Sequence, residues 1–336
     1  MEFPGEKLVI KLWETVAEKG IGSLFKPWQM QREGRVSIQL KGEELIVMAQ
    51  AEQQADLIRK GKTSIGGSKN IKLPAVLEAS SQENESDVSP EYDFTNAVNE
   101  ISIADTVRRE VNITRSLLWA EESLQDDKQE PPDAKVDDDW LFRWRDSASE
   151  VSSEELQYLW GKVLAGEVKA PGSFSLRTLE FIRNLSTQEA ELIATLSEFN
   201  IAGVIYREAK ESLEEKGLTF DTLLYMQDIG VLSGVEAIGM KMNWKSQDGT
   251  SFKQVLTSNS MALIISGQDP GATMTLPIYK LTSIGQQVLC LGKFGPNVDY
   301  LRKLGEPLKS QGFNVVLAKY YDVAPGEIYW FDGHNL

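Results

Sequence analysis

Few residues of this chain have the types and spacing that catalytic chemistry requires. The sequence contains one histidine and one cysteine. These counts exclude H-E-x-x-H metalloproteases, metal sites with several histidine ligands, cysteine-cluster zinc sites and an intrachain disulfide. The single histidine, His334, stands two residues from the end, and we expect no catalytic role for it. The sequence therefore does not reveal a reaction.

Carboxylates are the remaining candidates for metal or acid–base chemistry. The run Asp137-Asp138-Asp139 has the oxygen ligands that hard cations prefer. Adjacent residues on a helix point apart, however, so helix capping and a favourable helix dipole explain this run better. Glu167 and Arg177 flank a Pro-Gly turn, where we expect a buried ion pair of structural use. A metal-dependent hydrolase that uses Asp138, Asp139 and Glu167 is the less favoured alternative, and we expect no resident metal or cofactor.

Local signatures of nucleotide binding and of serine hydrolases are missing. Gly61-Lys62-Thr63 resembles the end of a P-loop, but the position of its first glycine is Asp56 and no apolar strand precedes it. Neither G-x-G-x-x-G nor G-x-S-x-G occurs. The sequence therefore does not support dinucleotide binding or the nucleophile elbow of a hydrolase.

Residues 217–291 raise the question of nucleic-acid binding. A helix over 219–229, a hairpin at Asp248-Gly249 and a strand entering Leu281-Thr282-x-x-Gly285 predict a winged-helix-like arrangement. The recognition helix contains two aspartates and no lysine or arginine, so it is unsuited to read bases in the major groove. We favour a winged-helix shape used for protein contact. A wing contact with nucleic acid stays open, because the hairpin carries Lys241, Trp244, Lys245 and Lys253.

The formal net charge of −15 is unevenly distributed. Residues 1–70 contain 11 basic and 9 acidic side chains, a net of +2; residues 71–167 contain 9 and 23, a net of −14; the remainder contains 15 and 18, a net of −3. A broad phosphate-binding face needs clustered basic residues, which this distribution disfavours. We interpret the acidity as a solvated surface that aids solubility.

The ends and the apolar runs predict a soluble cytoplasmic protein. The opening residues Met1–Glu6 are acidic and no apolar stretch follows them, so we expect no signal peptide. The longest apolar run, at 261–265, is far shorter than the roughly 20 residues that a membrane span needs. Cys290 is expected to stay reduced in the cytoplasm.

The order of the patterns predicts an α+β protein with a mainly helical N-terminal arm and central domain and a C-terminal winged-helix-like α+β domain. The arm, residues 1–60, contains helices over 6–19 and 27–60; Leu8, Leu12, Trp13 and Val16 form a stripe on the first. Residues 61–94, rich in Gly, Ser and Asn, predict a flexible linker. An all-helical domain is expected over 95–216 and the α+β domain over 217–336.

Capping patterns mark the helices of the central domain. Ser152-x-x-Glu155 and Ser186-x-x-Glu189 are predicted capping boxes. Behind the first, a buried helix face is predicted by apolar residues at i, i+3, i+4, i+7 and i+8, which are Leu156, Leu159, Trp160, Val163 and Leu164.

The C-terminal third alternates between strands and helices. Strands are predicted at 238–244 and 252–256, paired as the hairpin, and at 261–266 and 273–281. A helix capped by Thr282 and a helix over 298–311 follow. The last strands are expected at 313–320 and 327–331.

The segment 139–179, here called the signature segment, resembles a bacterial family labelled as a domain of unknown function. The resemblance rests on Asp139-Trp140, on LWGKVLAGE at 159–167 and on PGSFSLRTL at 171–179. Pro27-Trp28-Gln29-x-x-Arg32 and Leu281-Thr282-x-x-Gly285 also look like that family. Part of the signature segment is similar to abortive-infection alpha-type proteins. What the resemblance implies is a bacterial protein with a role in phage defence, and no catalytic residues.

These patterns favour a non-enzymatic interaction protein of the bacterial cytoplasm, a phage-defence or stress component. We expect a homo-oligomer joined by the N-terminal helices. A nucleic-acid-binding regulator is the first alternative, and contact of the N-terminal helices with a membrane is disfavoured. The candidate binding residues are Trp140, Arg143, Glu167, Arg177, Lys241, Trp244, Lys245 and Lys253.

Overall fold

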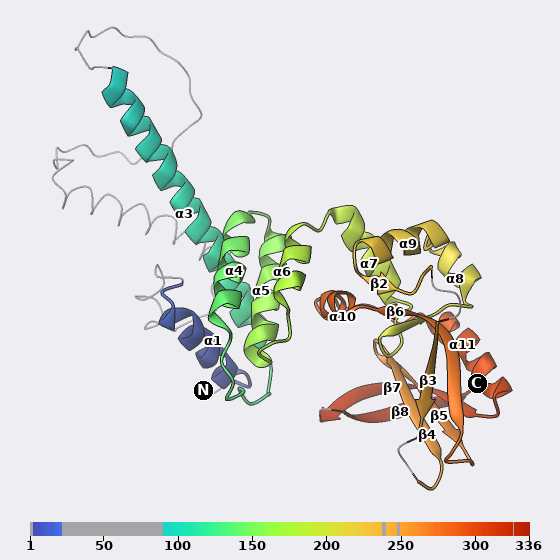
Figure 1. The fold of residues 1–336 in the computed structure, drawn as a ribbon. Helices are drawn as coiled ribbons and strands as arrows, with labels where there is room; N and C mark the ends of the chain where they lie inside the picture. The colour runs from blue at the N-terminus through green and yellow to red at the C-terminus, as the bar shows by residue number, and fades with distance from the viewer. Residues whose placement is uncertain (1–2, 22–89, 237–239, 247–248, 325) are drawn as a thin grey trace. The chain divides into compact units, whose positions relative to one another are not determined.

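The computed structural model describes residues 3–21, 90–236, 240–246, 249–324 and 326–336. The chain forms two compact units, Met1–Ser173 and Phe174–Leu336. Helices make up the described part of the first unit, and antiparallel sheets with helices make up the second (Figure 1). The predicted α+β class is confirmed. The domain boundary that the sequence predicts, between residues 216 and 217, lies within the second unit.

The first unit is built around the long helix α3 (Pro90–Leu124). Helices α4 (Asp138–Glu150) and α5 (Glu154–Lys169) both pack against α3. α3 begins at Pro90, so its first turn falls within the predicted linker; the rest of that linker and the predicted helix over 27–60 lie outside the described residues. None of the helices in the described ranges is both long and apolar enough to cross a membrane.

Helix α1 (Glu6–Glu18) packs against α3 and α5. Its predicted stripe is buried there at Leu8, Leu12 and Val16. The backbone N–H of Gly5 donates to the carbonyl of Gln125 at 2.9 Å, and a Cβ at position 5 would lie 1.7 Å from the carbonyl oxygen of Leu124. Only glycine therefore lets α1 begin this close to the end of α3.

The buried face of α5 differs from the predicted one at its first turn. Trp160, Val163 and Leu164 are buried as expected, but Leu156 is 41% exposed and Gln157 is 1% exposed. The Gln157 amide is held inside because it donates to Asn112 Oδ1 at 3.2 Å and to the Val151 carbonyl at 3.1 Å. Periodicity could not reveal this, since it takes glutamine to be a surface residue.

The helix caps are local features that the sequence predicts well, with one shift. Asp137 caps α4 by accepting from the Trp140 N–H at 2.9 Å. The predicted box at Ser152 is wrong by one residue, because Ser153 caps α5 by accepting from the Leu156 N–H. The Ser186–Glu189 box is confirmed, with both reciprocal hydrogen bonds present.

The second unit opens with helices and returns to them after its first sheet. Helices α6 (Leu176–Arg183), α7 (Thr187–Ser197), α8 (Lys210–Glu215) and α9 (Phe220–Asp228) come first. Helix α10 (Ser283–Leu289), capped by Thr282 as predicted, packs against α6 and α7. The unit therefore joins helices that are about a hundred residues apart in sequence.

The first sheet has four strands. Three follow the order β1-β6-β2, which are β1 (Val204–Tyr206), β6 (Thr273–Leu281) and β2 (Leu232–Ser233), and the fourth, β3 (Lys241–Lys245), also pairs with β6. The prediction that 95–216 is all-helical is wrong at β1, where Ile205 is fully buried and opposite Tyr279 of β6. A strand of three residues gains its stability from this distant partner and leaves little local pattern.

The second sheet has the order β4-β5-β7-β8. Helix α11 (Val298–Ser310) packs against β7. All strand pairs are antiparallel. The four strands are β4 (Phe252–Ser258), β5 (Met261–Gly267), β7 (Asn314–Ala324) and β8 (Glu327–Asn335).

The hairpin predicted around Asp248-Gly249 is wrong in its pairing. The strand β3 (Lys241–Lys245) pairs with β6, with Trp244 opposite Met274. β4 pairs with β5 instead, with Val255 opposite Ile264. Within the described residues the two segments meet only at their ends, where the Gln254 side chain donates to the Lys245 carbonyl at 2.7 Å. Turn residues predicted the reversal of the chain but not which strands pair across it.

Candidate functional site

The structure does not bring the candidate carboxylates together. Asp138 and Asp139 are exposed at the start of α4, whereas Glu167 is 1% exposed. The Lys19 ammonium lies 2.5 Å from the Asp138 carboxylate, and this hydrogen bond raises the pKa of Lys19. Among the described residues, no three His, Cys, Asp or Glu side chains gather to hold an ion. The described residues therefore contain no cluster of three carboxylates of the kind that the hydrolase alternative uses.

Glu167 has a structural place at the end of α5. Its Oε1 accepts from the backbone N–H of Gly172 at 2.5 Å, and Gly172 has φ of +89°, which glycine adopts without strain. The carboxylate thus closes the turn after the helix. Arg177 is exposed on α6. The sequence predicts that Glu167 and Arg177 are both buried, and only Glu167 is.

The other candidates on the helices divide into core and surface. Trp140 is 3% exposed and belongs to the core of the first unit, whereas Arg143 is exposed on the same helix, α4. Core packing is the role that the structure supports for the tryptophan.

The candidate lysines lie on two different strands. Lys241 and Lys245 are exposed at alternate positions of β3 and share one face, and Lys253 is exposed on β4. Trp244 is half-buried on the opposite face of β3. The three lysines therefore do not lie on a pair of hydrogen-bonded strands, although the ends of β3 and β4 are adjacent.

An exposed group of aromatic side chains extends from the second sheet. It lies on residues 319–324 of β7 and 327–331 of β8, which are here called the aromatic arm. Figure 1 shows the ribbon of these two strands. Tyr321 is directly opposite Tyr329, and their ring centroids are 5.2 Å apart. The ring of Phe331 lies 6.2 Å from that of Tyr321. Three aromatic rings thus share one face of a two-stranded ribbon.

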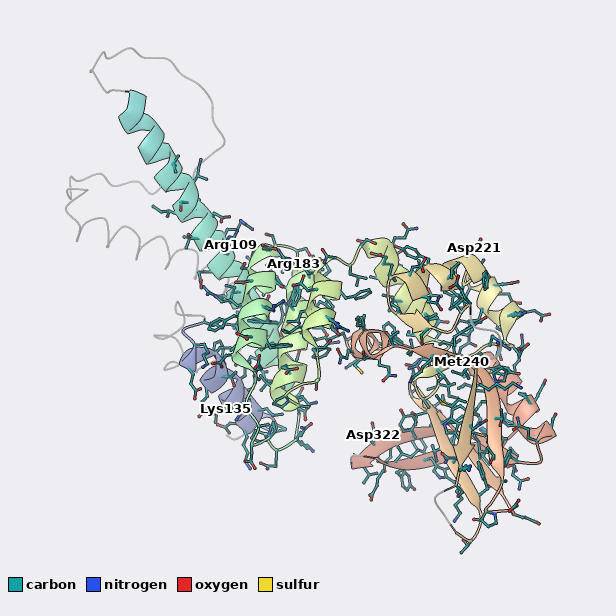
Figure 2. All side chains as sticks on the ribbon, in the orientation of Figure 1. Arg109, Lys135, Arg183, Asp221, Met240 and Asp322 are labelled. Carbon is teal, nitrogen blue, oxygen red and sulfur yellow. The ribbon has the colours of Figure 1, made fainter. Side chains whose placement is uncertain are left out.

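Both faces of the aromatic arm carry exposed side chains. Tyr320 and Ile328 on it are half-buried, and five other large apolar side chains are 43% to 62% exposed: Tyr321, Val323, Tyr329, Trp330 and Phe331. Trp330 is opposite Tyr320, on the face away from Tyr321. Asp322 marks the outer part of the arm (Figure 2). No other part of the described chain places as many exposed large apolar side chains together.

A bulge and an ion pair fix the base of the aromatic arm. The β7–β8 register shifts between Leu317 and Lys319, where Asp332 has φ of +54°. Lys319 lies 2.9 Å from the Asp332 carboxylate, and its hydrogen bond lowers the pKa of that carboxyl. Bulges of this kind re-aim a strand. They also interrupt the free edge of β8, which limits its pairing with other strands.

Sequence reasoning missed this surface because it ended the first of the two strands before Tyr321. The predicted strands stop at Tyr320 and Phe331, whereas β7 continues to Ala324 and β8 to Asn335. The available signal was the repetition of aromatic residues, Tyr320-Tyr321 and Tyr329-Trp330-Phe331, on either side of a Pro-Gly turn.

Comparison with known families adds one match. Residues 103–204 match the model of a family described as a protein of unknown function, DUF2806. The match runs from within α3 to the start of β1 and contains the whole signature segment. Neither the curated proteins nor the solved structures contain a match to the chain. The aromatic arm and the candidate lysines lie outside the matched range.

Proposed function

We propose that this chain is a non-enzymatic protein-interaction component and that the aromatic arm is its contact surface. The observation that carries the proposal is the exposure of Tyr321, Tyr329 and Phe331 on one face of the ribbon. Contiguous exposed apolar surface marks interaction sites, and tyrosine, tryptophan and phenylalanine are enriched at interface cores. A two-stranded ribbon is also marginally stable alone in water, so covering it with a partner stabilises it.

The charge of the arm favours a protein over nucleic acid or an anionic membrane. Lys319 is its one basic residue among the described positions and is paired with Asp332. Asp322 and Glu327 add negative charge near the tip. Phosphate groups would be repelled there.

Self-association through the arm is the form of contact that we propose. The sequence predicts that the N-terminal helices join the copies, but α1 already buries its stripe within its own unit. The aromatic arm is an exposed apolar surface of the described residues that a second copy can cover. The predicted helix over 27–60 lies outside these residues.

The test is the mass of the full chain in solution, measured by light scattering over a range of concentrations. The variant Tyr321→Ser/Phe331→Ser is expected to shift the mass towards one copy. Tyr158→Ser, which removes an exposed ring on α5, is the control and is expected to keep the wild-type mass. An unchanged mass in the arm variant contradicts the proposal, and so does a wild-type chain that is a monomer throughout.

The role in phage defence rests on the likeness of the signature segment to abortive-infection proteins. We propose it as the setting of the interaction function. Plating a phage panel on bacteria with and without this gene tests it: fewer plaques with the gene are expected. Equal plaque numbers across the panel would contradict the role in phage defence and would not affect the proposed interaction function.

The winged-helix-like description is proposed for the first part of the second unit. It is supported by the strand order β1-β6-β2 with α8 and α9 between β1 and β2. Nucleic-acid binding through its wing is the second candidate function, favoured by the shared exposed face of Lys241 and Lys245. If this alternative holds, the wild-type chain is expected to bind labelled oligonucleotides and the variant Lys241→Gln/Lys245→Gln is expected to lose that binding.

A further inference from the structure

The outward faces of α7 and α9 form a groove of about 330 Å³ with a mixed polar and apolar lining. Ser186, Gln188, Glu189 and Leu192 line it from the α7 side, and Asp221, Thr222 and Tyr225 line it from α9. Asp221 is labelled on α9 in Figure 2. The groove belongs wholly to the second unit and shares no residue with the aromatic arm.

Glu189 is held in a fixed position by neutral donors. Its Oε2 accepts from the Ser186 backbone N–H at 2.7 Å and from the Ser186 hydroxyl at 2.6 Å. Its Oε1 accepts from the Tyr225 hydroxyl at 2.7 Å. None of these donors is a cation, so within the described residues the carboxylate has no ion pair. A carboxylate that is positioned and has no ion pair is suited to a charge-assisted hydrogen bond with an incoming cation.

The two helices carry charge of one sign only. α7 contains Glu189 and Glu191, α9 contains Asp221 and Asp228, and neither contains a lysine or arginine. No ion pair joins Glu189 or Asp221 to a basic side chain within the ranges that the structure describes. The face formed by the helices is thus complementary to a basic partner.

Apolar and aromatic surface accompanies this charge. Phe220 is 53% exposed and Tyr225 is 43% exposed at the outer side of α9, and Leu192 lies in the groove. Aromatic faces attract the guanidinium of arginine, and the aliphatic stem of that side chain covers apolar surface. Arginine uses these features together with a carboxylate better than lysine does.

We infer that the α7–α9 groove binds a basic segment of a partner protein, with an arginine side chain placed between Glu189 and Asp221 and against the ring of Tyr225. This goes beyond the proposed contact through the arm. α9 occupies the recognition position of the winged-helix-like arrangement, so that position serves a basic protein segment instead of DNA. A divalent cation is not the occupant, because the three neutral donors on Glu189 leave too few free carboxylate oxygens for a hard cation.

The experiment measures binding of a short fluorescent peptide, with arginines at helical spacing, to the full chain by anisotropy. The groove variant is Glu189→Gln/Asp221→Asn; glutamine at position 189 retains the capping box. The control variant is Glu211→Gln/Glu214→Gln, which removes the same charge from exposed positions of α8. A second probe replaces each arginine by its neutral analogue citrulline.

The groove variant is expected to weaken binding of the arginine peptide about tenfold, because hydrogen bonds to two charged carboxylates become weaker bonds to neutral amides. The control variant is expected to weaken it less than about threefold, and the citrulline peptide is expected to bind neither protein. Equal losses in the two variants, or equal binding of the citrulline peptide, would overturn the inference. A change of light-scattering mass in the groove variant would also overturn it, because a second copy would then be the occupant. The arm variant Tyr321→Ser/Phe331→Ser should bind the arginine peptide normally, which separates this result from the proposed function.

Discussion

The indole N–H of Trp144 donates a hydrogen bond of 2.8 Å to the backbone carbonyl of Trp160. Both side chains are at most 1% exposed, and the bond joins α4 to α5. These two of the three tryptophans in the signature segment therefore hold the core of the first unit together instead of lining a site.

Replacing Trp144 by phenylalanine tests this role. The variant removes the donor and shrinks a buried ring, so we expect the free energy of unfolding to fall by about 2 kcal/mol. Urea unfolding followed by circular dichroism measures the change. Trp330→Phe, at a 45% exposed position, should cost less than about 0.5 kcal/mol. Equal effects of the two substitutions would contradict the assignment.

The second prediction concerns the crossing of α5 and α3 at Gly161. A Cβ there would lie 2.6 Å from the Cβ of Trp119 and 2.8 Å from the carbonyl oxygen of Ser116. Gly161→Ala is therefore expected to lower the melting temperature, although alanine favours a helix by about 1 kcal/mol over glycine. Gly295→Ala, where nothing lies within 4 Å of the added carbon, is the matched control. A Gly161→Ala variant as stable as the control would show that the helices can separate without cost.

The third prediction concerns the contact between α6 and α10. The hydroxyl of Thr178, which is fully buried, donates to Gln287 Oε1, and the backbone N–H of Ser175 donates to the same oxygen at 3.0 Å. Thr178→Val keeps the shape and removes one donor, which should cost about 1 kcal/mol of unfolding free energy.

A double-mutant cycle distinguishes a direct bond from general packing. Thr178→Val combined with Gln287→Leu should show a coupling of at least about 0.5 kcal/mol in urea unfolding. Additive losses would mean that the two side chains stabilise the unit independently.

The fourth prediction is the titration of Glu189. The hydroxyl of Ser186, its backbone N–H and the Tyr225 hydroxyl lower the pKa of this carboxyl. Because the folded-state pKa lies below the unfolded value, the ionised group stabilises the fold above the ordinary carboxyl pKa. This contribution is lost as the pH falls through the lowered value.

Ser186→Ala removes the largest of these causes and should raise the pKa of Glu189 towards its ordinary value. The carboxyl carbon shift in an NMR titration measures it directly. Tyr225→Phe should raise the same pKa by less, since the Tyr225 hydroxyl is the smaller cause. An unchanged pKa in Ser186→Ala would show that the capping box does not set the charge state of the groove.

Local patterns predicted the helices and most of their caps. Asp137, Ser186 and Thr282 cap helices where the sequence places them, because a cap needs only a side chain and a backbone group three residues away. The burial of Gln157 escaped prediction, because it depends on Asn112, which lies 45 residues earlier.

Strand pairing could not be predicted from the sequence, because it also depends on residues that are distant along the chain. The pattern indicated strands near β3 and β4, but whether they pair with each other or with β6 and β5 depends on free energies of distant packing. The length of β7 and β8, and with it the aromatic arm, follows from a pairing that continues past the core.

The sequence by itself determined the α+β class, most of the helix caps and the exclusion of multi-histidine and cysteine-cluster metal sites, since these follow from composition and short-range spacing. Only the tertiary structure decided which residues are available for binding. It left Arg177, Tyr321 and Phe331 exposed and placed Glu189 beside Tyr225, 36 residues later in the chain. Exposure and proximity depend on how remote segments fold against each other, and no local pattern of residues encodes that relationship.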